Sequence, residues 1–305
     1  MGFIYIKAPI KRVAIGVIIS FFMVFSTAVW ADESSQASMG PALWKMENGD
    51  STLYLFGSFH MLRKGVNWRK PYITSAIDSS DDIILEASEA DIKPEQLQLL
   101  MRSQAFYTPP ENLDMYLDDM VMERMLLLMQ DMEIPISMIN QFKPWYASSL
   151  IAIHHAIKNG FLPEHGVEAI LTKQANERGV AVYGLESAYE QISALSSYSN
   201  ELQTLMLEQV IEDIEGLPEL YDGLMTAWMT GNEEEMAELM VDEMKKFPQV
   251  FDRIYTKRNQ NWVAPLVEYL NQPGVHFVTV GTAHLVGEGS VIELLQVEGY
   301  EAERQ

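Results

Sequence analysis

The sequence predicts an α/β fold with a mostly parallel central sheet built from two related βαβ halves. Two apolar, β-prone runs each end at a glycine that precedes a histidine by three residues, which gives His60 and His284. Two further apolar runs lead to Glu86 and Glu186. Helix-like segments separate these runs, and such alternation is typical of parallel sheets covered by helices.

In the first half, the sequence predicts a hairpin whose second strand leads to His60, then a helix and a further strand. Residues 43–46 and 52–56 are β-prone and flank Asn48-Gly49, a strong turn signal. The pattern of residues 71–79 then predicts an amphipathic helix that begins with proline, and that of residues 82–87 predicts a strand. We therefore expect His60 and Glu86 at the carboxyl ends of neighbouring elements of one βαβ unit.

A large helical insertion is predicted at about residues 90–165, and it is rich in methionine. Met122, Met125, Met129 and Met132 follow at spacings of three, four and three residues, which places them on one helix face. Because thioethers fill irregular gaps in protein cores, we predict a packing role for these methionines.

The second half predicts a helix, a strand, a long helical stretch and a final strand. Glu168 lies in the first turn of the helix predicted within 164–179, where its negative charge stabilises the helix dipole. We therefore predict a structural role for Glu168. The predicted elements are helices within 164–179, 190–248, 253–270 and 290–297, strands at 180–183 and 276–280, and an edge strand at 300–304.

Residues 1–31 have the pattern of a secretory signal peptide. Lys7, Lys11 and Arg12 precede an apolar run, and the stretch Ala28-Val-Trp-Ala31 provides small residues at the −1 and −3 positions of a cleavage site after Ala31. The alternative is an uncleaved anchor, because the run nearly reaches spanning length. We expect an exported, periplasmic or secreted protein, anchored in the inner membrane if the segment is retained, with residues 32–305 as one domain.

Composition narrows the classes of function. The chain has 305 residues, no cysteine and a net charge of −22. Without cysteine there is no disulfide, no thiolate nucleophile and no cysteine-ligated metal. A surface of this charge repels nucleic acid, so we expect no nucleic-acid partner.

The residues at the strand ends predict a metal site. His60, His284 and Glu86 carry the donor atoms that suit manganese, zinc, cobalt or iron. Such a metal would keep an open position for a water and lower its pKa, and Arg258 could stabilise an oxyanion. The alternative is a mechanism without a metal, in which the same residues act and a histidine paired with a glutamate is the general base.

The motifs also resemble the TraB/GumN family, which is grouped with the Tiki metalloproteases and, more distantly, with erythromycin esterase and ChaN-like proteins. The resemblance covers about residues 43–304. The residues that carry it are Gly57-Ser-Phe-His60, Gly281-Thr-Ala-His284, Glu86, Arg258-Asn259, Trp262, Leu185-Glu186, Gln191 and Lys143-Pro-Trp145.

The resemblance implies an α/β core with both GxxH histidines and a glutamate at one site, associated in the Tiki branch with metal-dependent peptide cleavage. By position, His60, Glu86 and His284 match the metal or catalytic pattern, and Arg258 and Asn259 match a supporting pair. Glu186 and Glu168 are additional matches.

We therefore expect an exported metal-dependent hydrolase of peptides or other small substrates. The predicted metal ligands are His60, His284 and Glu86, and the predicted catalytic residues are Glu86, Arg258, Asn259 and Glu186. The first alternative is a non-catalytic periplasmic or surface protein that binds a peptide or a haem-like ligand. The second is a metal-free hydrolase. A membrane partner is expected only if the N-terminal segment is retained.

Overall fold

The computed structural model describes residues 40–88, 92–130 and 132–305. The predicted signal peptide lies outside the described residues. No helix in the described ranges is long and apolar enough to cross a membrane.

A six-stranded sheet forms the centre of the fold, in the order β6-β4-β7-β2-β1-β8. Strands β6, β4, β7 and β2 run parallel, and the outer strands β1 and β8 pair in antiparallel fashion. The predicted α/β fold with a mostly parallel sheet is therefore confirmed. The strands span β1 Leu43–Asn48, β2 Ser51–Ser58, β4 Asp82–Ala87, β6 Ala181–Glu186, β7 Gly274–Gly281 and β8 Glu303–Arg304.

The register brings the four predicted strand ends to one edge of the sheet. Ser58 of β2 pairs with Gly281 of β7, and Ala87 of β4 pairs with Glu186 of β6. The two GxxH strands are thus neighbours, and so are the two glutamate strands. Residues that follow these strands can meet although they lie far apart in the sequence.

The strands form where apolar residues can be buried on both faces of the sheet. Leu55, Phe56, Phe277 and Val278 are fully buried. The ring of Phe56 stacks on that of Trp68, with centroids 5.5 Å apart. The ring of Phe56 also lies 6.0 Å from that of Phe277, so aromatic packing joins β2 and β7.

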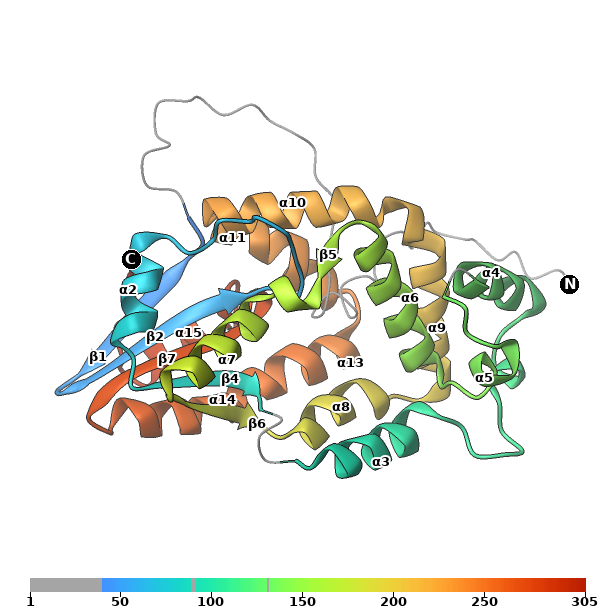
Figure 1. The fold of residues 1–305 in the computed structure, drawn as a ribbon, viewed down its shortest axis with the longest axis horizontal. Coiled ribbons are helices and arrows are strands. Elements are labelled where there is room, and N and C mark those ends of the chain that lie inside the picture. Colours follow the sequence, from blue (N-terminus) through green and yellow to red (C-terminus); the bar gives the residue numbers. More distant parts are fainter. Residues whose placement is uncertain (1–39, 89–91, 131) are drawn as a thin grey trace, which may run out of the picture.

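Helices cover the sheet and extend beyond its carboxyl edge (Figure 1). Figure 1 shows α4 and α5 at the end of the long axis opposite to the β1–β2 hairpin, with α6 and α9 between. The longer helices are α2 Pro71–Ser79, α3 Pro94–Ala105, α4 Asp119–Gln130, α6 Pro144–Lys158, α7 Val167–Arg178, α8 Ala188–Ser196, α9 Asn200–Asp213, α10 Leu217–Thr230, α14 Lys257–Leu270 and α15 Val291–Val297. The shorter elements are α5 Ile136–Ile139, α11 Glu233–Met236, α12 Glu243–Lys245, α13 Pro248–Phe251 and a two-stranded sheet of β3 Leu62–Arg63 and β5 Phe161–Leu162.

Most predicted elements agree with the structure, and several differ in extent. The strand predicted to begin at residues 180–183 and to end on Glu186 spans Ala181–Glu186, and its Gly184 packs closely on Ser88, where a Cβ would lie 2.6 Å from the amide nitrogen. The edge strand predicted at 300–304 is shorter, Glu303–Arg304. The single helix predicted at 253–270 begins with a π-helical turn, Asp252–Thr256, before α14. The predicted packing role holds for Met125 and Met129, which are fully buried.

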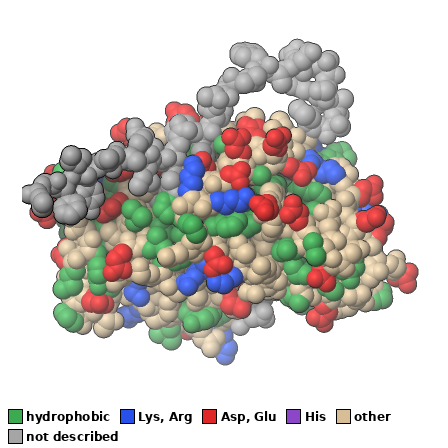
Figure 2. Space-filling model, turned by 180° about the vertical axis from the view of Figure 1, so that it is seen from behind, with side chains coloured by type: hydrophobic (Ala, Val, Ile, Leu, Met, Phe, Trp, Pro, Cys, Tyr) green, Lys and Arg blue, Asp and Glu red, His purple; other side chains and the backbone are tan. Residues whose placement is uncertain are grey.

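The surface reflects the acidic composition. Figure 2 shows carboxylates spread over the face opposite to that of Figure 1, with fewer Lys and Arg side chains among them. Such a surface agrees with the predicted absence of nucleic-acid binding, which stays a prediction.

Candidate functional site

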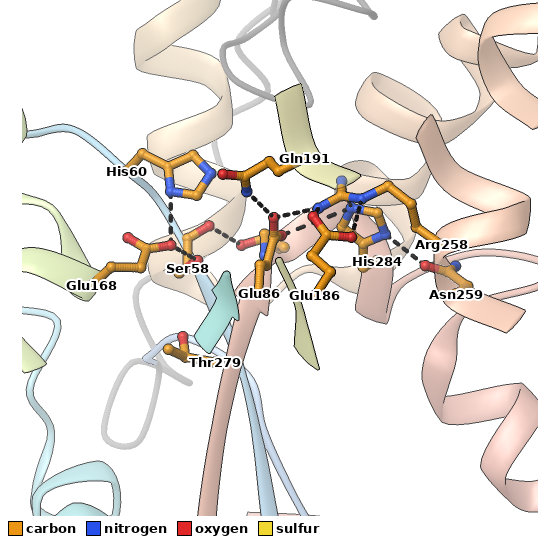
Figure 3. Close-up of polar contacts among 12 residues, drawn as sticks. Ser58, His60, Glu86, Glu168, Glu186, Gln191, Arg258, Asn259, Thr279 and His284 are labelled. Carbon is orange, nitrogen blue, oxygen red and sulfur yellow. Dashed lines mark hydrogen bonds and ion pairs between the residues drawn. The ribbon is translucent and has the colours of Figure 1, made fainter. Parts of the chain in front are cut away.

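The candidate site lies at the carboxyl ends of the parallel strands, where side chains from distant segments converge (Figure 3). Strands β2, β4 and β6 supply residues at or just after their ends, and β7 leads into a 3₁₀ turn, Thr282–Leu285. Helices α7, α8 and α14 supply the others. The assembled residues are Ser58, His60, Glu86, Glu168, Glu186, Gln191, Arg258, Asn259 and His284.

The glycine of the first motif allows the two GxxH turns to pack together. A Cβ at Gly57 would lie 2.8 Å from Oγ1 of Thr282 and 3.1 Å from its Cα. The Thr282 hydroxyl donates to the carbonyl oxygen of Ser58 at 3.0 Å. Trp228 covers the junction and donates from its indole nitrogen to the Gly57 carbonyl at 2.9 Å. The motif therefore needs glycine for close approach between segments.

A second glycine fixes the backbone of His60. A Cβ at Gly166 would lie 2.1 Å from the carbonyl oxygen of His60. The amide of Val167 donates to the carbonyl of Phe59 at 3.0 Å. This close contact brings the first turn of α7, and with it Glu168, up to the end of β2.

His60 forms an ion pair with Glu168. Its Nδ1 lies 2.8 Å from Oε1 of Glu168, which also accepts a hydrogen bond from the Ser58 hydroxyl. The imidazole is 25% exposed and the carboxylate 18%. Burial by itself would lower the pKa of His60, but the charge and hydrogen bond of Glu168 outweigh it and raise the pKa to about 9. His60 is therefore protonated at neutral pH.

Arg258 occupies the other half of the site, between two carboxylates. Its Nη2 donates to Glu86 and to Glu186, each at 2.7 Å, and its Nε donates to Glu186 at 3.0 Å. All three side chains are at least nine-tenths buried. Burial would lower the pKa of Arg258, but the charges of Glu86 and Glu186 raise it, so the guanidinium stays charged.

His284 is held as a neutral imidazole. Its Nδ1 lies 2.5 Å from Oδ1 of Asn259, whose amide group donates to the carbonyl of Gly289. That hydrogen bond fixes the Asn259 oxygen as acceptor, so Nδ1 of His284 carries the proton. Its Nε2 then accepts from Nη1 of Arg258 at 3.0 Å. Burial, and then the charge of Arg258, lower the pKa of His284 to about 3.

Glu86 lies between the two halves of the site and stays ionised. Its Oε1 accepts from the amide of Gly281 at 2.5 Å, and Gln191 donates to its Oε2 at 3.4 Å. Burial would raise the pKa of Glu86, but the charge of Arg258 in particular holds it well below its usual range. In Figure 3 the Gln191 side chain lies between Glu86 and His60.

The side chains of the three predicted metal ligands are not arranged to bind one metal ion. Nε2 of His284 is 3.8 Å from Oε1 of Glu86, and the guanidinium of Arg258 contacts both residues. Nδ1 of His60 is engaged by Glu168. No group of three or more His, Asp or Glu residues in the described ranges could hold a metal ion as arranged. A metal would require Arg258 to withdraw, and metal binding stays a prediction.

Glu186 links the buried cluster to a cavity of about 430 Å³. Burial raises the pKa of Glu186 above its usual range, although Arg258 opposes the shift. The cavity is lined by Leu185, Glu186, Tyr189, Glu190, Ser193, Ala194, Ser197, Arg253, Lys257, Arg258, Asn261 and Trp262. A substrate in this cavity would reach Glu186 and Arg258 directly.

The structure brings together the predicted residues Glu86, Glu186, Arg258, Asn259 and His284 in one network. His60 lies on its far side and pairs with Glu168 instead. The interpretation of Glu168 as a helix-dipole charge alone was incomplete, because the carboxylate also binds His60 and Ser58. In the sequence, the family resemblance at Glu168 and the glycine directly before α7, Gly166, are the signals that could indicate this contact.

Three comparisons relate the chain to known proteins. The sequence model of the TraB/PrgY/gumN family matches residues 42–304. The uncharacterized proteins YbaP of Escherichia coli (strain K12) and of Shigella flexneri are each 22% identical to it over 268 residues, which is 88% of this chain and 97% of each relative. No solved structure matches the chain.

Proposed function

The chain belongs to the TraB/PrgY/gumN family, and we propose that it is an exported hydrolase that cleaves peptides at the strand-end site. The observation that carries the proposal is the pairing of His60 with Glu168 beside the Glu86–Arg258–Glu186 cluster. His60 provides a proton donor, Arg258 provides a cation in a fixed position, and Glu186 provides a carboxylate whose pKa is raised above its usual range. Hydrolysis of a carbonyl substrate requires these three functions.

His60 is the proposed general acid. Its pKa of about 9 keeps a proton on the imidazole at neutral pH, and Glu168 holds the ring through Nδ1. Because Glu168 holds Nδ1, the second proton of the imidazolium is the one on Nε2. In the proposed reaction it passes to the leaving nitrogen of the scissile peptide bond as that bond breaks.

Glu186 is the proposed general base. A carboxylate whose pKa is raised by its surroundings is a stronger base than an ordinary one, which suits a general base. Glu186 is such a carboxylate, and it lines the cavity of about 430 Å³. It would take a proton from the attacking water, whose oxygen then bonds to the substrate carbonyl carbon.

Arg258 is the proposed oxyanion stabiliser. Its Nη1 carries two N–H groups, of which one donates to His284, and the described residues provide no hydrogen-bond acceptor for the other. That group can donate to the oxygen of the tetrahedral intermediate. His284 and Asn259 would act through Arg258, because their hydrogen bonds fix the orientation of the guanidinium.

Metal dependence, which the family resemblance implies, is a separate prediction about the same site. His60, Glu86 and His284 have suitable donor atoms, but their present contacts to Glu168 and Arg258 do not fit a bound metal. We therefore derive the proposed reaction from the protein side chains alone.

A peptide-binding protein without catalysis is the second candidate. A cavity of about 540 Å³ between α4 and α5 favours it, since the cavity is mainly apolar and carries Asp119 and Glu123 at its edge. Leu127 and Ile136, which also line it, are 63% and 66% exposed. Exposed apolar surface of this kind is common at protein-binding sites.

Hydrolysis of a mixed peptide library by the purified protein, followed by mass spectrometry, tests the proposal. We expect cleavage by the wild type, loss of about 10²-fold or more in Glu186→Gln and His60→Gln, and unchanged cleavage in Glu234→Gln, an exposed carboxylate on α11. The assay is repeated after chelation and after loading with zinc or manganese. Saturable peptide binding without cleavage under all these conditions would reject the hydrolase and favour the binding protein.

A further inference from the structure

A second cavity, of about 290 Å³, lies between α4, α6 and α9 and shares no lining residue with the strand-end site. In Figure 1 these helices lie beyond the carboxyl edge of the sheet. Most of the wall is aliphatic. The lining residues are Arg124, Leu127, Leu128, Met132, Ile151, His154, His155, Lys158, Ile211, Ile214 and Glu215.

The polar part of this cavity is mainly basic, although the chain as a whole carries a net charge of −22. Arg124 and Lys158 line it with two histidines, and Glu215 is the single carboxylate among the described lining residues. Nη2 of Arg124 donates to the carbonyl of Ile211 at 2.9 Å, which holds the guanidinium against α9. Two of the chain's basic side chains, Arg124 and Lys158, thus line the same cavity of an acidic protein.

His154 also lines the cavity, but its Nε2 does not face it. This nitrogen is buried, so a ligand in the cavity would not reach it as the side chains lie. Arg124 and Lys158 are therefore the basic groups that a ligand would meet.

The shape and chemistry together describe an amphipathic anion. A volume of about 290 Å³ holds roughly ten groups of the size of a water molecule. An aliphatic chain of roughly eight carbons would therefore fit on the wall formed by Leu128, Ile151 and Ile214, where its transfer from water is favourable. A carboxylate at its end would meet the basic side chains of Arg124 and Lys158.

We propose that the cavity between α4, α6 and α9 binds an aliphatic carboxylate, with the carboxylate at Arg124 and Lys158 and the chain against the apolar wall. This site is independent of the proposed hydrolase function. It places a small-molecule ligand in the helical segment that follows β4.

Isothermal titration of the purified protein with octanoate tests the proposal, with octanol and octylamine as ligands of equal chain length and different charge. We expect one saturable octanoate site, binding of octanol weaker by about tenfold or more, and no binding of octylamine. That difference corresponds to about 1.4 kcal/mol from the charged group.

Two variants locate the site. Arg124→Gln removes the charge, and Leu127→Asp places a carboxylate on an exposed position of the lining, so neither disturbs a fully buried side chain. Both should weaken octanoate binding by about tenfold or more, while Lys173→Gln, an exposed lysine on α7, should not. Circular dichroism checks that each variant is folded. Absent or non-saturable octanoate binding, equal affinity for octanol, or full affinity in both folded variants would overturn the proposal.

Discussion

Nη1 of Arg258 lies 3.0 Å from Nε2 of His284, and this contact determines the protonation state of the histidine. Because a guanidinium can only donate, Nε2 must accept, and the proton resides on Nδ1 beside Asn259. The rings of Tyr255 and Trp262 flank the imidazole, with centroids 5.9 and 4.6 Å away. In this arrangement His284 fixes the orientation of Arg258.

Replacing Arg258 with methionine should lower the free energy of unfolding by about 3–5 kcal/mol. The substitution leaves Glu86 and Glu186 buried without their cation, and an uncompensated buried charge has a cost of this size. Urea denaturation at pH 7 measures the change. The triple variant Arg258→Met/Glu86→Gln/Glu186→Gln should recover part of the loss. Equal stability of wild type and Arg258→Met would contradict the ion-pair assignment.

Removing the guanidinium should also strengthen metal binding. Arg258→Ala opens the space between His284 and Glu86 and removes a positive charge that repels a cation. We expect tighter binding of Zn²⁺ by calorimetry than in wild type, and loss of that gain when His284→Ala is added. If wild type binds Zn²⁺ as tightly as Arg258→Ala does, then Arg258 does not compete for the metal position.

Gly166→Ala should displace the His60 backbone and impair the site. The added Cβ would lie 2.1 Å from a backbone carbonyl oxygen that has no room to move away freely. We expect a destabilisation of about 1–3 kcal/mol from overpacking and reduced peptide cleavage. Gly216→Ala is the matched control, because Gly216 has a helical backbone with φ of −89°, and it should be close to neutral. Thermal unfolding of both variants gives the comparison.

The His60–Glu168 pair should stabilise the protein in a defined pH range. Since the pKa of His60 is raised from 6.5 to about 9 on folding, its proton stabilises the fold fully below pH 6.5. That stabilisation is lost as the pH rises through 9. The stability difference between wild type and Glu168→Gln should therefore shrink from pH 6.5 to above 9. A constant difference over that range, measured by denaturation, would mean that His60 is neutral.

The sequence predicts those parts of the fold that depend on local patterns. The hairpin at Asn48-Gly49, the helix from Pro71 and the strand ending at Ala87 follow from turn chemistry and apolar runs, and the structure confirms them. The neighbouring GxxH strands are also consistent with the predicted parallel sheet.

The side-chain contacts within the site could not be predicted from local sequence patterns. Whether Arg258 donates to Glu86 or lies exposed depends on how α14 packs across the strand ends, which no local pattern encodes. Glu168 is a normal first-turn residue by sequence, and only the close approach of Gly166 to His60 turns it toward the histidine. The same limit applies to the metal prediction, because donor types can be recognised from residues while their convergence cannot.

The pH dependence of peptide cleavage tests the central claim most directly. With His60 as acid and Glu186 as base, kcat/KM should increase with pH as Glu186 loses its proton, which happens above the ordinary glutamate range. It should then reach a plateau and fall as His60 loses its proton through a pKa of about 9. In Glu168→Gln the upper limb should move down toward 6.5, because the charge that raises the pKa of His60 is removed. An upper limb that stays in place in Glu168→Gln, or a rate that rises through pH 9 in wild type, would contradict the assignment of His60 as the acid.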